Sequence, residues 1–318
     1  MTTNRHDKPT KSRELQIFQY LHPRMKLATE EKQHLDYLYK GYLGELEFYN
    51  RLQQTELKNH LILYDLLLPS NHTEFQIDSL LIWQTRIFLF EVKNFEGEFY
   101  LEQDNWYVAL TGKEIKNPLL QLRRSEFLLR QLLQKWGHDI PIEPYIIFIH
   151  PEFTLYQAPQ NLPIILPTQL NRFLKKLHAS TPVITRKQKR VVDQFIVHHK
   201  EQSAYEQLPQ YEYDKLKKGI ICPSCTGFLK PFTYKKMICE TCGRQENIES
   251  SVMRSVKEFA LLFPHRKITT SRIHEWCETI YSKKTIQKIL ATHLTPAGEK
   301  RYTFYLPKKE IITINNPD

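Results

Sequence analysis

Apolar residues along the first third of the chain fall into short runs separated by turn-forming residues. Residues 60–69 are rich in Leu and Ile and close at Pro69. Residues 75–97 contain two apolar runs around a turn at 83–86, and residues 97–110 contain another pair of runs. Because short apolar runs bounded by turns are typical of β-hairpins, we expect successive antiparallel strands here.

A longer periodicity appears in residues 35–52, where apolar side chains recur at the spacing of one helix face. Gly41 and Gly44 lie inside this expected amphipathic helix, and each costs about 1 kcal/mol relative to alanine. Glycine is tolerated inside a helix when something must approach the backbone closely. The apolar positions of the face are Leu35, Leu38, Tyr42, Leu46 and Tyr49.

A second helix is expected at residues 117–137, because a proline stands in its first turn and a glycine follows its end. A short buried strand is expected at 143–151, and a strand that leads into a helix is expected at 161–180. Helices that flank β-hairpins in this order predict one α/β domain over residues 31–180.

The rest of the chain divides into four parts by composition. Residues 1–30 are charged and weakly patterned and are interpreted as an N-terminal arm with one short helix, and residues 181–218 as a helical linker. Residues 219–250 hold four of the five cysteines. Residues 251–318 show three short helical patterns followed by a β-hairpin with its turn near Gly298.

The composition indicates a globular protein with a basic surface. Hydrophobic residues make up 41% of the 318 residues, which is enough for a core, and the net charge is +10. Such a charge favours a polyanionic partner, and the alternative is a basic surface that only keeps the protein soluble. No apolar run reaches the roughly 18 residues of a membrane span. The polar N-terminus does not have the pattern of a secretory signal, so we expect a cytoplasmic protein.

The hairpin at 75–97 carries charges that an apolar strand pair would normally exclude. Alternation places Glu91 and Lys93 on one face of their strand, and pairing around the turn brings Asp78 close to Glu91. Two nearby carboxylates repel each other, and a divalent cation such as Mg²⁺ or Mn²⁺ removes that conflict. With a lysine beside it, such a site suits phosphodiester hydrolysis. From these three residues alone, the alternative is an edge hairpin with a surface salt bridge.

Short motifs surround this hairpin in a fixed order. They are GYLGELE with Gly41, Gly44 and Glu45, FQIDSLLI with Gln76, Ile77 and Asp78, IFLFEVKNFEGEF with Glu91, Lys93, Asn94 and Gly97, then Trp106, and NPLLQ with Asn117, Pro118 and Gln121. Over about residues 35–175 this order resembles the nuclease-related domain, the NERD family, of the PD-(D/E)xK nuclease superfamily. One departure is Ile77, which stands where the superfamily has proline before its first aspartate. The resemblance implies a restriction-endonuclease-like mixed sheet flanked by helices.

The resemblance also implies roles for individual residues. Asp78, Glu91 and the carbonyl group of Val92 would hold a catalytic Mg²⁺ or Mn²⁺, and Lys93 would be the catalytic lysine. Glu45 would add a ligand or orient water, and Gln121 would contact the site or the substrate. For Glu45 the alternative is an exposed helix acid, and for Gln121 it is a polar residue at a helix N-terminus.

Cys222, Cys225, Cys239 and Cys242 form two C-x2-C pairs with thirteen residues between them. Four thiolates at this spacing suit a tetrahedral Zn²⁺ site, and a filled four-cysteine site is structural. Disulfides or free thiols are the alternative, and a cytoplasmic location disfavours disulfides. We therefore predict a C4 zinc ribbon at 219–250, which would fold with its metal. This ribbon resembles the small C4 ribbons appended to topoisomerases and to some NERD proteins.

The ribbon and the C-terminal part are candidates for nucleic-acid binding. Lysines among aromatic residues on the ribbon suit single-stranded or distorted nucleic acid. Three helices followed by a hairpin resemble a winged helix, whose third helix would enter the major groove while the wing contacts the backbone. The second helix would be capped by Thr270 or Ser271 and the third by Ser282. The alternative is a helical protein-interaction domain. The candidate contacts are Lys230, Lys235 and Lys236 on the ribbon, Lys283, Lys284 and Lys288 on the third helix, and Arg301 on the wing.

These observations together predict a metal-dependent nuclease that hydrolyses phosphodiester bonds in DNA, with RNA as a possible substrate. One alternative is a nucleic-acid-binding regulatory protein with an inert or weakly active nuclease fold. Another is a protein-interaction scaffold, which would show no salt-sensitive binding to nucleic acid. The sequence does not indicate an oligomeric state.

Overall fold

The computed structural model describes residues 6–55, 57, 60–70, 73–83, 85–178, 185–278 and 281–308 of the chain. The chain divides into two compact units. Unit 1 comprises residues 1–13 and 33–206, and unit 2 comprises residues 14–32 and 207–318. Among the described residues, no helix combines the length and the apolar character needed to cross a membrane.

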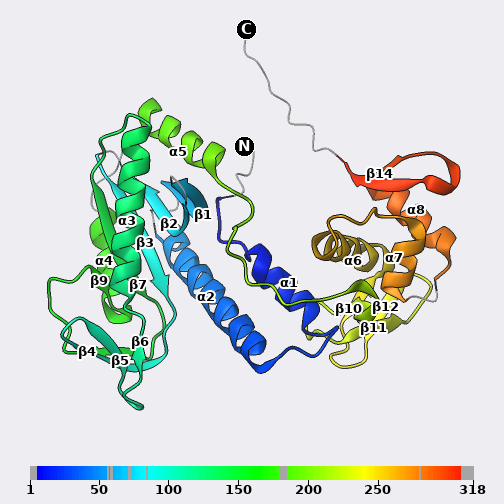
Figure 1. Ribbon diagram of the computed structural model, residues 1–318, viewed down its shortest axis with the longest axis horizontal. Helices are drawn as coiled ribbons and strands as arrows, with labels where there is room; N and C mark the ends of the chain where they lie inside the picture. The colour runs from blue at the N-terminus through cyan, green and yellow to red at the C-terminus, as the bar shows by residue number, and fades with distance from the viewer. Residues whose placement is uncertain are drawn as a thin grey trace, which may run out of the picture. The chain divides into compact units, whose positions relative to one another are not determined.

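Unit 1 is built on a five-stranded mixed sheet with the strand order β1-β2-β3-β7-β9 (Figure 1). Strands β1, β2 and β3 are antiparallel neighbours, whereas β3, β7 and β9 run parallel. A parallel neighbour requires a crossover connection, and α3 lies in the connection between β3 and β7. The bounds are β1 Leu61–Ser70, β2 Thr73–Ile82, β3 Ile87–Lys93, β7 Ile142–Phe148, β9 Ile164–Ile165 and α3 Pro118–Lys135.

Helices bury both faces of this sheet. Residues of α3 and α5 pack in one apolar cluster with the strands, and residues of α2 and α4 pack in a second cluster. Alternate strand residues join different clusters, so Leu89 belongs to the first and its neighbour Phe90 to the second. The expected α/β fold with a mixed sheet flanked by helices is confirmed. The bounds are α2 Thr29–Gln53, α4 Pro167–His178 and α5 Arg186–His198.

A smaller sheet with the order β6-β5-β4-β8 lies between β3 and β9 in the chain. Its strands β4 and β5 are the pair predicted at residues 97–110. Trp106 of β5 is fully buried and stacks on Phe148 of β7, with ring centroids 5.8 Å apart. The motif tryptophan therefore joins the small sheet to the main one. The bounds are β4 Gly97–Glu102, β5 Asn105–Val108, β6 Glu114–Ile115 and β8 Phe153–Tyr156.

In the described residues from 207 onward, unit 2 contains a four-stranded cysteine-bearing sheet, three α-helices and a terminal hairpin (Figure 1). The hairpin strands β14 and β15 pair antiparallel, and Ile268 forms an isolated bridge to Tyr305 beside them. The bounds are β10 Ile220–Ile221, β11 Phe228–Pro231, β12 Lys236–Cys239, β13 Gln245–Asn247, α6 Ile248–Leu262, α7 Thr270–Cys277, α8 Lys283–His293, β14 Leu294–Ala297 and β15 Phe304–Pro307.

The predicted N-cap of α8 is present in the structure, whereas the N-cap of α7 is a different residue from the two that were predicted. The side chain of Ser282 accepts a hydrogen bond from Thr285 N–H and caps α8, as its position predicts. For α7 the cap is Thr269 instead of Thr270 or Ser271. Thr269 has extended backbone and its hydroxyl accepts from Arg272 N–H at 3.3 Å, whereas Thr270 is already helical.

Residues 14–32 form part of unit 2 instead of a separate arm. Helix α1, Arg13–Leu21, buries one apolar face. Arg24 is buried, pairs with Glu258 of α6 at 2.6 Å and donates to the carbonyl of Gly219 at 2.9 Å. An unpaired buried arginine is costly, so this network fixes the segment to the rest of unit 2. Local sequence patterns do not reveal this pairing, because Arg24 and Glu258 lie far apart in the chain.

Candidate active site and cysteine cluster

Asp78 and Glu91 lie opposite each other where β2 and β3 stop pairing. The last antiparallel pair is Ser79↔Phe90, and the next position in this register joins Asp78 to Glu91. In place of a ladder bond, Oδ2 of Asp78 accepts a hydrogen bond from the backbone N–H of Val92 at 2.7 Å. Both acids are buried. The structure therefore brings the two predicted acids together on one face of the hairpin.

Strand β1 contributes an acid that sequence reasoning missed. Pairing between β1 and β2 skips Asp65, which has a φ of 51° in mid-strand and lies opposite Asp78 in the register. The carboxylate of Asp65 accepts hydrogen bonds from Thr10 and from Gln76, each at 3.1 Å. In the sequence, Asp65 is a single acid within an apolar run, and such a pattern alone is weak evidence for a functional residue.

Lys93 and Gln121 converge on the carboxylate of Glu91. Nζ of Lys93 donates to Oε1 of Glu91 at 2.8 Å and to Oε1 of Gln121 at 2.9 Å. The Gln121 amide donates in turn to Oε1 of Glu91 at 2.5 Å. Both bonds to Glu91 use Oε1, so Oε2 takes part in neither. The three predicted residues form one closed set of hydrogen bonds.

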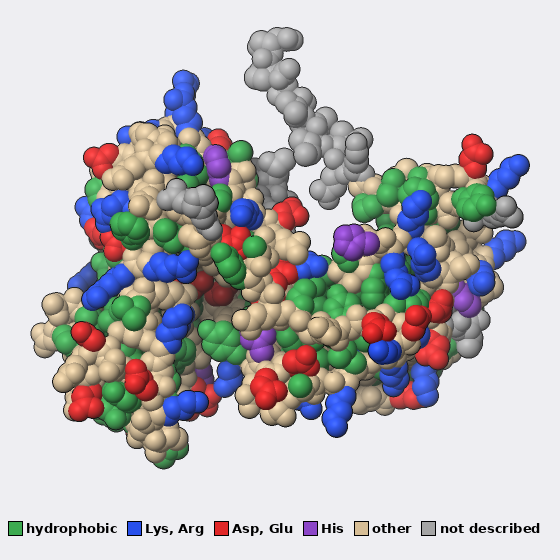
Figure 2. Space-filling view, in the orientation of Figure 1, with side chains coloured by type: hydrophobic (Ala, Val, Ile, Leu, Met, Phe, Trp, Pro, Cys, Tyr) green, Lys and Arg blue, Asp and Glu red, His purple; other side chains and the backbone are tan. Residues whose placement is uncertain are grey.

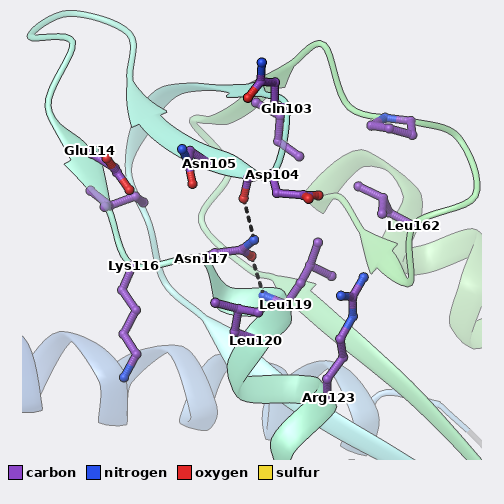
Figure 3. Close-up of a pocket in the computed structure, with 13 residues that line it drawn as sticks. Gln103, Asp104, Asn105, Glu114, Lys116, Asn117, Leu119, Leu120, Arg123 and Leu162 are labelled. Carbon is purple, nitrogen blue, oxygen red and sulfur yellow. Dashed lines mark hydrogen bonds between the residues drawn. The ribbon is translucent and has the colours of Figure 1, made fainter.

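The cap of α3 explains why Gln121 reaches the strands. The side chain of Asn117 accepts a hydrogen bond from Leu119 N–H at 2.8 Å and donates one to the carbonyl of Asp104 at 2.7 Å, as Figure 3 shows. Asn117 therefore fixes the start of α3 to the turn between β4 and β5. Because Gln121 lies in the first turn of that helix, the cap also sets its position.

A pocket of about 490 Å³ opens beside the start of α3 (Figure 3). Its lining mixes apolar side chains such as Leu120 with Lys116 and Arg123 and with the acids Asp104 and Glu114. Because both signs of charge are present, this lining does not indicate one class of ligand.

Helix α2 approaches the end of β3 through Gly44. A Cβ atom built on Gly44 would lie 2.7 Å from Cβ of Asn94, so only glycine allows this contact. The Asn94 amide donates to the carbonyl of Lys40 at 2.9 Å. The close approach expected for a helix glycine is therefore present at Gly44. It brings Glu45, the next residue, to the strand acids.

The electrostatics of the site follow from burial and from like charges. Burial and the neighbouring Glu91 raise the pKa of Asp78 to about 8. Burial and the charges of Asp78, Asp65 and Glu91 raise the pKa of Glu45 well above its ordinary value. Burial alone would lower the pKa of Lys93, but Glu91 and Asp78 outweigh it and raise that pKa, so the ammonium stays charged.

This charge balance fits the divalent cation that the resemblance implies. Four carboxyl groups act on one another here, and Lys93 is hydrogen-bonded to one of them. Protonation of Asp78 and Glu45 is one way to relieve the repulsion, and a hard dication held by oxygen atoms is another. Val92 lies past the last β2–β3 pair, where its carbonyl can add an oxygen to those of Asp78 and Glu91.

The acids do not form a tight group of three. Within the described residues, one group of three or more His, Cys, Asp or Glu side chains has all its ligand atoms within 4.8 Å of one another, and it is the four cysteines. Within the described residues, therefore, no three of Glu45, Asp65, Asp78 and Glu91 have their ligand atoms all within that distance of one another.

Cys222, Cys225, Cys239 and Cys242 meet at the ends of the ribbon strands. Their sulfur atoms lie 3.7 Å apart for Cys222–Cys242 and 3.4 Å apart for Cys225–Cys239, and none forms a disulfide. A tetrahedral Zn²⁺ with bonds of about 2.3 Å separates its sulfur ligands by about 3.8 Å. The four thiols therefore fit zinc, as the spacing predicts.

The backbone around the cysteines forms two tight turns. Cys222 N–H donates to Gly227 O at 2.6 Å, and Cys239 N–H donates to Arg244 O at 2.9 Å. A Cβ atom on Gly227 would lie 3.3 Å from the sulfur of Cys239, so the first turn requires a small residue. Each turn brings the two cysteines of its pair close together, as two ligands of one metal ion require.

The lysines proposed to contact nucleic acid differ in their surroundings. Lys230 pairs with Glu240 at 2.8 Å, and Lys235 lies over the Tyr234 ring at 5.3 Å. Figure 2 shows basic side chains spread among acidic ones over the visible face of each unit, so the positive charge forms no single patch on this face. Lys236, Lys283, Lys284 and Lys288 are exposed, and the side chain of Arg301 lies outside the described part of the structure.

Residues 40–149 match the family model of the nuclease-related domain, NERD. The chain therefore carries a nuclease-related domain, and the resemblance drawn from the motifs is confirmed. The matched residues include Glu45, Asp78, Glu91, Lys93 and Gln121. Comparisons with curated proteins and with solved structures found no match.

Proposed function

We propose that this protein is a metal-dependent phosphodiesterase that cleaves nucleic acid. The observation that supports it is the hydrogen-bonded set of Lys93, Glu91 and Gln121, placed opposite Asp78 within a nuclease-related domain. An acid pair with a charged lysine beside it suits hydrolysis of a phosphate diester better than it suits a structural ion pair.

Asp78, Glu91 and the Val92 carbonyl would hold the Mg²⁺ or Mn²⁺. When bound, such a cation polarises phosphate oxygens and lowers the pKa of a bound water. Side chains of the protein would position the phosphate and the attacking water. Lys93 places a positive charge beside the scissile phosphate and can hold the attacking water through its ammonium donors. Because Gln121 bonds to both Lys93 and Glu91, it orients them.

Unit 2 would deliver the domain to its substrate, which we propose to be DNA, with RNA as the second candidate. A zinc-bound ribbon would present Lys230, Lys235 and Lys236. The three helices and the hairpin of unit 2 follow the order expected of a winged-helix-like domain. In it, α8 would face nucleic acid with Lys283, Lys284 and Lys288, while Arg301 would lie on the wing. A cytoplasmic location fits this function.

Cleavage of plasmid and of single-stranded DNA in Mg²⁺, Mn²⁺ and EDTA tests the proposal. Wild type should cleave with either metal and not in EDTA. Lys93→Met keeps the length of the side chain but removes its charge, so we expect cleavage to fall at least about 100-fold while DNA binding persists. Gln121→Glu would keep the size of the side chain but replace its amide donor with a fifth carboxyl group beside the other four.

The alternative function is nucleic-acid binding with an inert nuclease fold. One observation favours it: Oε1 of Glu91, a proposed metal ligand, is already the shared acceptor of Lys93 and Gln121. Binding by wild type without cleavage in Mg²⁺ or Mn²⁺ would support this alternative and contradict the enzyme.

A further inference from the structure

Two glycines interrupt α2, and the structure explains only one of them. Gly44 is required by the close approach of Asn94. A Cβ atom on Gly41 would meet nothing within 4 Å, and Gly41 is exposed. A glycine inside a helix is destabilising relative to alanine. The packing of the described residues gives no reason for Gly41, which leaves a bound molecule as the candidate reason.

Gly41 lies on the face of α2 that borders the acid site. Residues four apart share a helix face, so Tyr37, Gly41 and Glu45 are in line. Lys40 and Gly44, which lie before and after Gly41 on the helix, both contact Asn94, the residue that follows Lys93 at the end of β3. The side chain of Tyr37 is 66% exposed. Along this helix face, Glu45 lies beside the acids and Tyr37 presents an exposed aromatic ring. Gly41 lies between them and leaves the helix backbone uncovered.

We propose that this row, the Tyr37–Gly41 face, binds one strand of the substrate beside the scissile phosphate. The sugar–phosphate chain would pass over Gly41, where the missing side chain leaves room against the helix backbone. An unpaired base would stack on the exposed ring of Tyr37. The inference rests on the proposed function and narrows its substrate to a single-stranded polynucleotide or an unpaired end.

Base stacking on one aromatic ring recognises no particular sequence, because every base has a π-face. A paired base is already stacked within its duplex and would not gain the contact. The Tyr37–Gly41 face should therefore discriminate between single and double strands and not between sequences.

The test is binding in EDTA, measured by fluorescence anisotropy with a labelled single-stranded oligonucleotide and with its duplex. We expect Tyr37→Ala to weaken single-strand binding about tenfold and duplex binding less than about twofold. Gly41→Gln should weaken single-strand binding similarly, because a long side chain would fill the space. Its Tm should rise by about 2–4 °C, because Gln favours a helix more than Gly does.

Matched controls lie on the other side of α2. Tyr39 and Leu43 are 41% and 39% exposed, and each stands two residues from its counterpart in the row. Tyr39→Ala and Leu43→Gln should bind both oligonucleotides as wild type does. Single-strand binding within about twofold of wild type for Tyr37→Ala and Gly41→Gln would overturn the inference. An equal loss in the controls, or no binding by wild type, would also overturn it.

Cleavage separates this inference from the proposed function. If wild type cleaves, Tyr37→Ala should raise KM about tenfold with kcat nearly unchanged, because the lost contact is one of binding. A normal KM in that variant overturns the inference and leaves the proposed function intact. If wild type binds single strands through this face but never cleaves, the proposed function fails and the binding site remains.

Discussion

The carboxylate of Asp78 accepts the backbone N–H of Val92 at 2.7 Å, and it thereby continues the pairing of two strands past the end of their ladder. Asp78 thus has a structural role, the hydrogen bond to Val92, in addition to its proposed role as a metal ligand. Asp78→Ala would remove both the hydrogen bond and the metal ligand. Asp78→Asn keeps an oxygen that can accept the same hydrogen bond, so it isolates the charge.

The first prediction concerns pH. The folded pKa of Asp78 is about 8, far above the ordinary value of about 3.9, so between these values the folded state holds more protons than the unfolded state. Stability then falls as pH rises through this window. In EDTA, the Tm of wild type should drop from pH 5 to pH 8 more than that of Asp78→Asn does. Parallel curves for the two proteins would contradict the raised pKa.

The second prediction compares the two glycines of α2. Gly44→Ala places a Cβ atom 2.7 Å from Cβ of Asn94, so it should destabilise the protein by about 1–3 kcal/mol. Gly41→Ala meets nothing and should stabilise the protein by about 1 kcal/mol. Urea unfolding of both variants measures the difference. Adding Asn94→Gly to Gly44→Ala should recover part of the loss, and a strictly additive double variant would argue against the contact.

The third prediction concerns zinc. Wild type should contain one zinc ion per chain by elemental analysis, because one group of four thiols converges in the described residues. Cys225→Ser should lose the ion and unfold the ribbon, since metal binding supplies its folding energy. Cys277→Ser is the matched control, because Cys277 is buried in α7 away from the cluster, and it should keep the zinc. Full zinc content in Cys225→Ser would rule out the four-cysteine site.

The fourth prediction concerns the lysines of α8. A lysine that contacts a phosphate contributes about 0.7–0.9 to the slope of log affinity against log salt concentration. Lys284→Gln and Lys288→Gln should each lower that slope by about this amount. Lys257 is exposed on α6, and Lys257→Gln should leave the slope unchanged. If all three variants give the wild-type slope, α8 does not face nucleic acid.

Local patterns predicted the hairpin of β2 and β3, because alternation and a turn determine which residues lie opposite each other. The same reasoning placed Asp78 near Glu91. The preference of proline for the first turn of a helix put Pro118 at the start of α3. The motif order, read as a family resemblance, added Glu45 and Gln121. Glu45 reaches the strands through the contact of Gly44 with Asn94, and Gln121 through the hydrogen bond of Asn117 to Asp104. Periodicity does not reveal such contacts between distant segments.

Two features were beyond the reach of the sequence for a physical reason. Asp65 adopts a positive φ, which is uncommon for residues other than glycine, and the pairing of β1 with β2 skips it. The buried pair of Arg24 and Glu258 joins residues more than two hundred positions apart. The composition of residues 1–30 indicated a separate arm, because composition carries no information about a distant partner such as Glu258.

A crystal structure of wild type soaked in Mn²⁺, with anomalous diffraction, shows whether the strand acids hold a metal ion. We expect a peak about 2.0–2.3 Å from a carboxylate oxygen of Asp78, from one of Glu91 and from the Val92 carbonyl. The peak should vanish in Asp78→Asn. No peak there at saturating Mn²⁺, with Lys93 and Gln121 still bonded to Glu91, would contradict the proposed metal site and the hydrolysis that depends on it.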